Sequence, residues 1–122
     1  MRLLASIVFV GSLATALPAS AECRWGGGRW FLSDEGPWTQ SLSMNAGESC
    51  QKAFAYNGAV ILKRLNLYEQ PAHGKLALRK GGYMTYVPNA AFRGSDTFLV
   101  EVCGEEGGSA RCAKLRFQVS VR

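Results

Sequence analysis

The residues of this sequence best suited to chemistry are its cysteines, Cys23, Cys50, Cys103 and Cys112. Catalytic thiol pairs favour a C-x-x-C spacing, and zinc sites favour paired ligands about two to four residues apart. Neither spacing occurs here. The cysteines are therefore expected to form structural disulfides, although a set of four is compatible with about three different connectivities.

The other candidates for catalysis are a histidine and two acidic pairs. His73 is the only histidine, so a histidine-based metal cluster is excluded, and its place in a proline and glycine turn favours a structural role. Asp34-Glu35 and Glu105-Glu106 are sequence neighbours in expected loops, a pattern that does not place two carboxylates about 5–9 Å apart across a sugar. Nucleophile-elbow, zinc-protease and phosphate-loop motifs are also missing. We expect no catalytic residue, no metal site, no cofactor and no enzyme activity.

An aromatic and glycine-rich segment at residues 22–37 is the strongest candidate for a binding surface. Its tryptophans and arginines, together with the tryptophan that follows, are residue types enriched at binding hot spots. These residues are Trp25, Trp30, Trp38, Arg24 and Arg29. The alternative, which we favour, is that the tryptophans plug one open end of a small sandwich. Because three consecutive glycines do not order cheaply, we expect a loop or a short edge strand around residues 29–32.

The first residues indicate export. A short positive head is followed by an apolar stretch over residues 3–17 and by the small-x-small pattern Ala19-Ser20-Ala21. We interpret residues 1–21 as a removed signal peptide, because the apolar run is shorter than the roughly 20 residues of a membrane-spanning helix. The mature chain would then have no integral membrane segment and would reside in the periplasm or outside the cell, where disulfides persist.

The composition limits the classes of partner that this chain is expected to bind. The formal net charge is +5, and no lysine-rich stripe or recognition motif of a nucleic-acid binder is present. We expect no nucleic-acid partner, whereas anionic polysaccharide or lipid headgroups remain compatible with this charge. Residues 22–122 are enough for one domain.

The elements that position the cysteines are clearest at the end of the chain. Residues 97–103 and 112–121 alternate in polarity, and their apolar sides share one face of a strand pair. Cys103 and Cys112 then fall on the opposite face, toward solvent, with the polar stretch 104–111 as the hairpin loop. Directly opposite positions suit a disulfide. Cys23 with Cys50 follows by elimination and would tether the tryptophan-rich segment to the second strand.

Shorter runs separated by Gly, Pro and Asn precede this hairpin. Strands are expected at residues 39–44, 50–56, 60–68, 75–79 and 83–87, with turns at 45–47, 57–58 and 71–74. About seven short strands at this spacing predict an all-β fold, a single sandwich over residues 38–122.

A set of turn, aromatic and aspartate positions recurs through the second half of the chain: Gln70, Pro71, His73, Gly74, Tyr86, Pro88, Phe92, Gly94, Asp96, Phe98 and Val102. With these positions the second half of the chain resembles bacterial immunoglobulin-like, cadherin-like domains, which usually occur in tandem arrays on surface and secreted proteins. The resemblance implies an Ig-like β-sandwich in which these are fold positions. Asp96 can accept backbone N–H bonds from a turn.

The sequence departs from the family in two ways. Many such repeats bind calcium through an aspartate-rich loop, but residues 56–59 carry no carboxylate, so we expect no calcium there. This chain also holds a single module with cysteines. We expect a non-catalytic binding or structural module whose ligand is a protein or a cell-envelope polysaccharide, or alternatively a small secreted inhibitor of an envelope-targeting enzyme that inserts the 104–111 loop.

Overall fold

A computed structural model of the chain describes residues 22–32, 35–54 and 60–122. The expected signal peptide, the turn at residues 57–58 and the loop expected not to bind calcium lie outside these residues. Every described element is a strand, and there are eight. They are β1 (Arg24–Gly27), β2 (Trp38–Met44), β3 (Cys50–Ala53), β4 (Val60–Glu69), β5 (Gly74–Arg79), β6 (Tyr83–Pro88), β7 (Gly94–Glu106) and β8 (Ser109–Val121). No helix in the described part of the chain is long and apolar enough to cross a bilayer.

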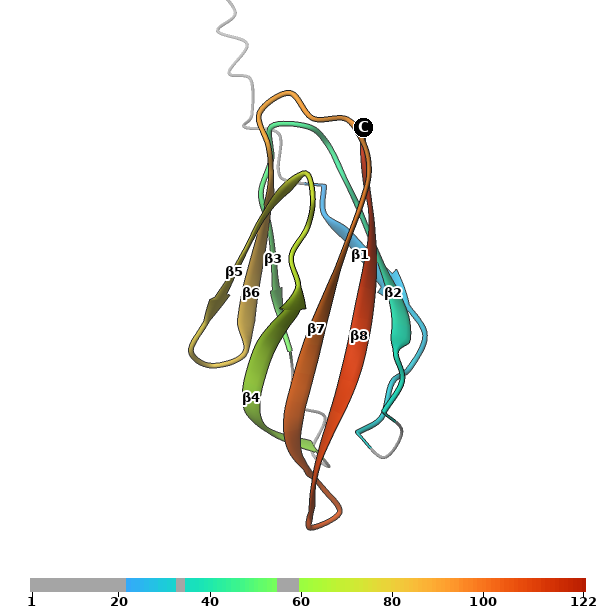
Figure 1. The fold of residues 1–122 in the computed structure, drawn as a ribbon, viewed down its shortest axis with the longest axis vertical. Helices are drawn as coiled ribbons and strands as arrows, with labels where there is room; N and C mark the ends of the chain where they lie inside the picture. Colours follow the sequence, from blue (N-terminus) through green and yellow to red (C-terminus); the bar gives the residue numbers. More distant parts are fainter. Residues whose placement is uncertain (1–21, 33–34, 55–59) are drawn as a thin grey trace, which may run out of the picture.

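The strands form two facing sheets. The larger has the order β1-β2-β8-β7-β4, and the smaller has the order β3-β6-β5. Figure 1 shows the larger sheet in front and the smaller one behind it on the β5 side. All the strand pairs are antiparallel except β2 with β8, which run parallel from Trp38 opposite Leu115 to Met44 opposite Val121. The expected all-β sandwich is confirmed.

The core lies between the sheets and is built by period-two alternation. The inward sides of β7 and β8 are almost fully buried, as the sequence predicted, with Phe98 and Phe117 at 0% exposure. Tyr86 of β6 stacks on Phe98 at 5.7 Å between ring centroids, and Phe98 stacks on Phe117 at 5.0 Å. A column of three rings therefore joins the small sheet to the large one, and such aromatic pairs add to the free energy gained by burial.

The hairpin between β7 and β8 corrects the expected loop at residues 104–111. Both strands continue through this stretch in unbroken register as far as Glu106 opposite Ser109, which leaves only Gly107 and Gly108 as the turn. Both glycines have positive φ, 60° and 82°, as a two-residue turn between twisted strands requires. Polar, glycine-rich composition is typical of a loop, but here it belongs to a hairpin with a tight turn.

The N-terminal edge strand also differs from the expectation. It is β1, at residues 24–27, whereas residues 28–31 have no regular structure. Gly26 and Gly27 are part of this strand because they allow a close approach to β2. A Cβ atom on Gly26 would lie 2.7 Å from the Ser41 hydroxyl oxygen, and one on Gly27 would lie 2.8 Å from the Gln40 side chain.

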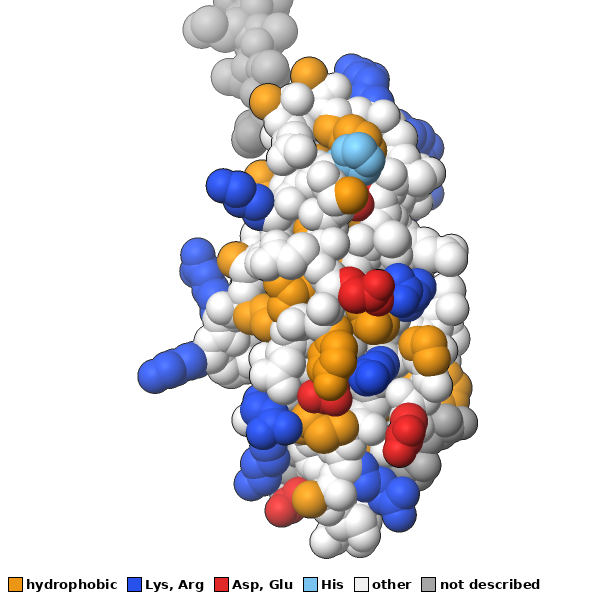
Figure 2. All heavy atoms as spheres, viewed as in Figure 1, with side chains coloured by type: hydrophobic (Ala, Val, Ile, Leu, Met, Phe, Trp, Pro, Cys, Tyr) orange, Lys and Arg blue, Asp and Glu red, His pale blue; other side chains and the backbone are white. Residues whose placement is uncertain are grey.

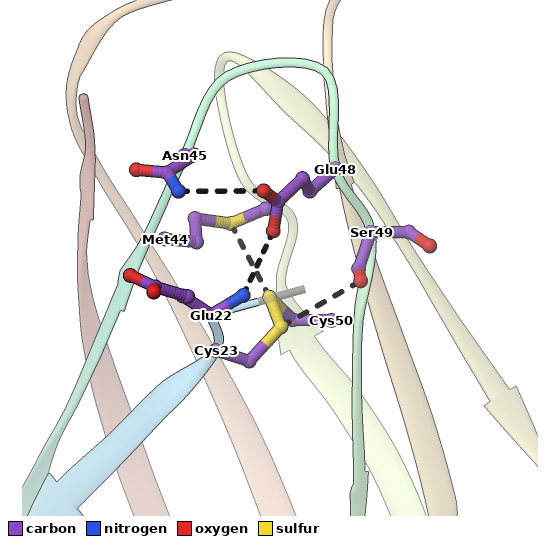
Figure 3. Close-up of a disulfide and its surroundings, with 7 residues drawn as sticks. All are labelled: Glu22, Cys23, Met44, Asn45, Glu48, Ser49 and Cys50. Carbon is purple, nitrogen blue, oxygen red and sulfur yellow. Dashed lines mark hydrogen bonds between the residues drawn. A yellow bond between two sulfur atoms is a disulfide. The ribbon is translucent and has the colours of Figure 1, made fainter. Parts of the chain in front are cut away.

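The disulfides join Cys23 to Cys50 and Cys103 to Cys112, the pairing favoured from the sequence. Figure 3 shows the first bridge, which fastens the chain before β1 to the start of β3. Beside it the Glu22 backbone N–H donates to the Glu48 carboxylate at 3.0 Å. The N-terminal segment is thus connected to both sheets, through β1 and through this bridge.

The outer face of the β7–β8 pair is less open than predicted. Cys103 and Cys112 lie directly opposite each other on the side away from the core, but Cys103 is only 6% exposed. An Arg64 guanidinium nitrogen and a Glu101 carboxylate oxygen each lie 3.5 Å from its sulfur. The expectation of a solvent-facing pair is wrong for Cys103, because long side chains on this face cover it.

Candidate functional site

The tryptophans of the N-terminal segment are packed on the core. Trp25 meets Phe117 edge to face at 5.7 Å, Trp30 meets Phe54 at 6.2 Å, and Trp38 meets Phe31 at 6.0 Å. Each tryptophan is partly buried and packs against the hydrophobic core cluster. Trp25 and Trp30 therefore each contact a buried ring, whereas the ring that Trp38 contacts is exposed.

The arginines predicted to accompany them, Arg24 and Arg29, are exposed. The cation that lies over aromatic rings here is instead Lys52 of β3, whose ammonium lies 5.4 Å from the Trp25 ring centre and 5.9 Å from that of Phe54. Burial lowers the pKa of Lys52. Its position among the rings was not apparent from the sequence, because β3 and β1 belong to different sheets.

A hollow of about 750 Å³ lies on the outer face of β2, β8 and β7. Hydroxyl and amide side chains line it: Ser41, Ser43, Ser95, Thr97, Gln118 and Ser120. Arg116 also lines it but is paired with Glu69 at 2.6 Å. His73 contributes to the same wall, and its ring stacks on Phe92 with 4.4 Å between centroids.

Histidine, serine and aspartate all line this hollow, but their contacts do not form a catalytic triad. One carboxylate oxygen of Asp96 accepts from the backbone N–H groups of Ala72 and Thr97. The other accepts from the His73 backbone N–H and, at 2.7 Å, from the Tyr86 hydroxyl. Asp96 is 7% exposed. It locks the turn before β5 to the start of β7 and does not orient the His73 ring, which extends its expected role as an acceptor of turn N–H groups.

The Tyr86 hydroxyl belongs to the same network. Burial raises the pKa of Tyr86 well above its usual range, and the hydrogen bond to the Asp96 carboxylate and its charge raise it further. The phenol is therefore a hydrogen-bond donor at neutral pH, which is a structural use of this side chain.

One group of potential metal ligands occurs among the described residues, formed by Glu101, Cys103 and Cys112. The two sulfurs are bonded to each other. They are therefore not available as thiolates, the form in which cysteine binds metal.

Basic side chains cluster between β4, an edge strand of the larger sheet, and the β5–β6 hairpin of the smaller sheet. A hollow of about 300 Å³ there has Lys63 and Arg64 on the β4 side and Arg79 and Lys80 on the hairpin side. Its apolar lining comes from partly buried leucines, Leu62, Leu65 and Leu78. A neighbouring hollow of about 400 Å³ shares Lys63 and Arg64, adds Arg111 of β8, and has Glu105 as its acidic lining residue.

We call the exposed cations of this region the basic margin; its members are Lys63, Arg64, Lys75, Arg79, Lys80 and Arg111. None of the six forms an ion pair with a described residue. Figure 2 shows basic side chains following the side of the molecule formed by β5 and the lower part of β4. This cluster was not apparent from the sequence, because its members come from three strands and a turn and do not form a run.

Comparison with known proteins agrees with this architecture. No curated protein matches the chain. A family model described as a bacterial Ig domain matches residues 39–113, which covers β2 to β7 and the beginning of β8. Members of this family are typically binding or structural modules rather than catalysts. With more than half of its length matched and the sandwich described above, this chain belongs to the bacterial Ig domain family.

Proposed function

We propose that this protein is an exported, non-catalytic Ig-like module that binds an anionic partner, a protein or an envelope polysaccharide, through the basic margin. The observation that carries the proposal is a set of six exposed cations without ion-pair partners among the described residues, five of which line two neighbouring hollows. Structural ion pairs would neutralise such charges, whereas unpaired charges attract a partner of opposite sign.

Two features support export. The N-terminal sequence has the composition of a signal peptide, and the chain contains two disulfides, which are typical of oxidising compartments. The tryptophans pack on the core and so contribute to stability. This favours a binding surface elsewhere on the domain.

A retention experiment tests the proposal. The exported protein is immobilised, exposed to an envelope extract, and eluted with increasing salt, since binding between exposed charges is screened by salt. The double variant R79E/K80E, which reverses one side of the smaller hollow, should lose the retained material. The control R93E/R122E reverses two exposed arginines outside the basic margin and should retain it. Equal retention by both variants would refute a role for the basic margin.

The hairpin formed by β7 and β8 supports a second candidate, an inhibitor of an envelope-targeting enzyme. In Figure 1 this hairpin projects past the other strands, and the Cys103–Cys112 disulfide links its two strands. Ser109 and Ala110 at its tip are exposed. If the hairpin enters an enzyme cleft, enlarging the tip with S109W or A110W should abolish a complex that R79E/K80E leaves intact, so the two candidates predict opposite results.

A further inference from the structure

We infer that the basic margin receives an extended segment of a partner protein, which adds as a strand to the outer edge of β5 and alternates apolar with acidic residues. This inference rests on the proposed function and specifies its ligand. It follows from the edges of the two sheets, from the side chains along β5, and from the charges beside it.

Among the described residues the two sheets have four edge strands, and β5 is the one best suited to strand addition. β1 and β3 are four residues long. β4 is longer, but its register with β7 breaks between Leu62 and Arg64 and again between Leu67 and Glu69. Short edges and bulges are features that prevent pairing with another chain. β5 pairs with β6 over six residues without a break and contains no proline, so its outer backbone groups remain regularly spaced.

The side chains of β5 define what an added strand must carry. Leu76 and Leu78 point toward the core side, and Lys75, Ala77 and Arg79 are exposed on the other face. Side chains of neighbouring strands meet on the same face. The inward residues of an added strand would therefore approach the leucine-lined hollow, where apolar side chains are favoured. Its outward residues would lie beside Lys75 and Arg79, where carboxylates are favoured.

The same charges argue against a second copy of this chain as the occupant. Pairing β5 with β5 of another copy would bring the lysine and arginine of one edge against those of the other, and like charges on paired strands are destabilising. An anionic polysaccharide could pair with the four cations that line the hollow beside its leucines and glycines, but it would leave the backbone groups of the β5 edge and the leucines unused, because a sugar chain has neither a pairing backbone nor apolar side chains. The observations therefore favour an acidic peptide.

The test uses NMR titration of the isotope-labelled, disulfide-bonded protein with three probes. The first is a short synthetic peptide of alternating valine and glutamate. The second has the same sequence with alternate backbone amides methylated, which keeps its charge but removes the hydrogen bonds needed for strand pairing. The third is an alginate oligomer, an anionic polysaccharide. Wild type is compared with K75E/R79E and with the matched charge reversal R93E/R122E.

We expect the first peptide to shift the amide signals of β5 and the methylated peptide to bind about tenfold more weakly or worse, which corresponds to about 1.4 kcal/mol. K75E/R79E should weaken binding of the first peptide by a similar factor, and R93E/R122E should leave it within about twofold. Dispersed spectra of both variants would show that they are folded.

Several results would overturn the inference. Equal binding of the two peptides would mean that charge alone attracts them. Shifts confined to β1 or β3 would place the partner on another edge. If the protein binds alginate but neither peptide, the inference of an added strand is refuted and the proposed function stands. If it binds none of the three probes and retains no envelope component, both are refuted.

Discussion

Replacing Asp96 by alanine should be among the most destabilising single changes to this domain. The carboxylate accepts four hydrogen bonds, from the backbone of Ala72, His73 and Thr97 and from the Tyr86 hydroxyl. In D96A the Tyr86 hydroxyl is left at a position with 0% exposure, and a buried donor without a partner costs about 1–3 kcal/mol. The N–H groups of the turn lie nearer to water and add about 1 kcal/mol. The expected total is about 2–4 kcal/mol.

Equilibrium unfolding in urea measures this loss as a lower midpoint with an unchanged slope. Y86F removes the buried donor together with its bond and should cost only about 1 kcal/mol. In the Y86F background D96A should lose less than in wild type, because no hydroxyl is then left without a partner. S95A, a change at the exposed neighbouring residue, should stay within about 0.5 kcal/mol of wild type. A D96A protein within about 1 kcal/mol of wild type would show that Asp96 does not hold the turn to β7.

The same network predicts a pH dependence. Burial, assisted by Asp96, raises the pKa of Tyr86 above that of an unfolded tyrosine. The folded state therefore keeps a proton that the unfolded state has lost, and this stabilisation is complete below about pH 10 and decreases above it. Wild type should lose up to about 1.4 kcal/mol per pH unit more than Y86F above that value. Parallel stability curves for the two proteins at alkaline pH would contradict the assignment.

Three other substitutions test the packing of the N-terminal segment and the disulfides. W25A should lower the unfolding free energy by about 2–4 kcal/mol because it removes the ring packed on Phe117. F31A, at a ring that is 44% exposed, should cost much less. Unchanged stability of W25A in thermal unfolding would indicate an exposed platform instead. K52M should be as stable as wild type or more stable at pH 7, since burial disfavours the ammonium of Lys52. This gain in unfolding free energy should shrink as pH rises toward 10.5, because wild type then loses the charge. A gain that grows with pH would be inconsistent with this. Opening the 23–50 bridge, whose cysteines are 27 residues apart in sequence, should cost about 3.5 kcal/mol of unfolding free energy in the chain-entropy model. The 103–112 bridge, with a separation of 9, should cost about 2.5 kcal/mol. Calorimetry of C23S/C50S and C103S/C112S should give this order, and the reverse order would point to native contacts instead of chain entropy.

The features of this fold that the sequence predicted are those encoded by local alternation. Phe98 and Phe117 were assigned to the core because apolar residues recur at every second position around them, and they stack there. Cys103 and Cys112 were paired because the same alternation placed them opposite each other.

Two of the differences from expectation arise from contacts between segments distant in sequence. Three consecutive glycines disfavour regular structure by themselves, but β2 approaches Gly26 and Gly27 so closely that larger residues would collide with Ser41 and Gln40. Cys103 was assigned to solvent because its face is polar, yet Arg64 from the neighbouring strand covers it. The basic margin likewise became visible only once the strands that carry it had been placed side by side.

The residues that stabilise this domain differ from those proposed to bind its partner. Trp25, Trp30 and Trp38 pack on the core cluster, where substitutions lower the free energy of unfolding. Lys75 and Arg79 are exposed, where substitutions usually change stability by less than about 0.5 kcal/mol. A charge reversal on β5 that removes binding without a change in unfolding midpoint therefore identifies a ligand contact directly. Loss of binding in a tryptophan variant has to be measured together with its stability, because an opened N-terminal segment would also release β1 from the large sheet.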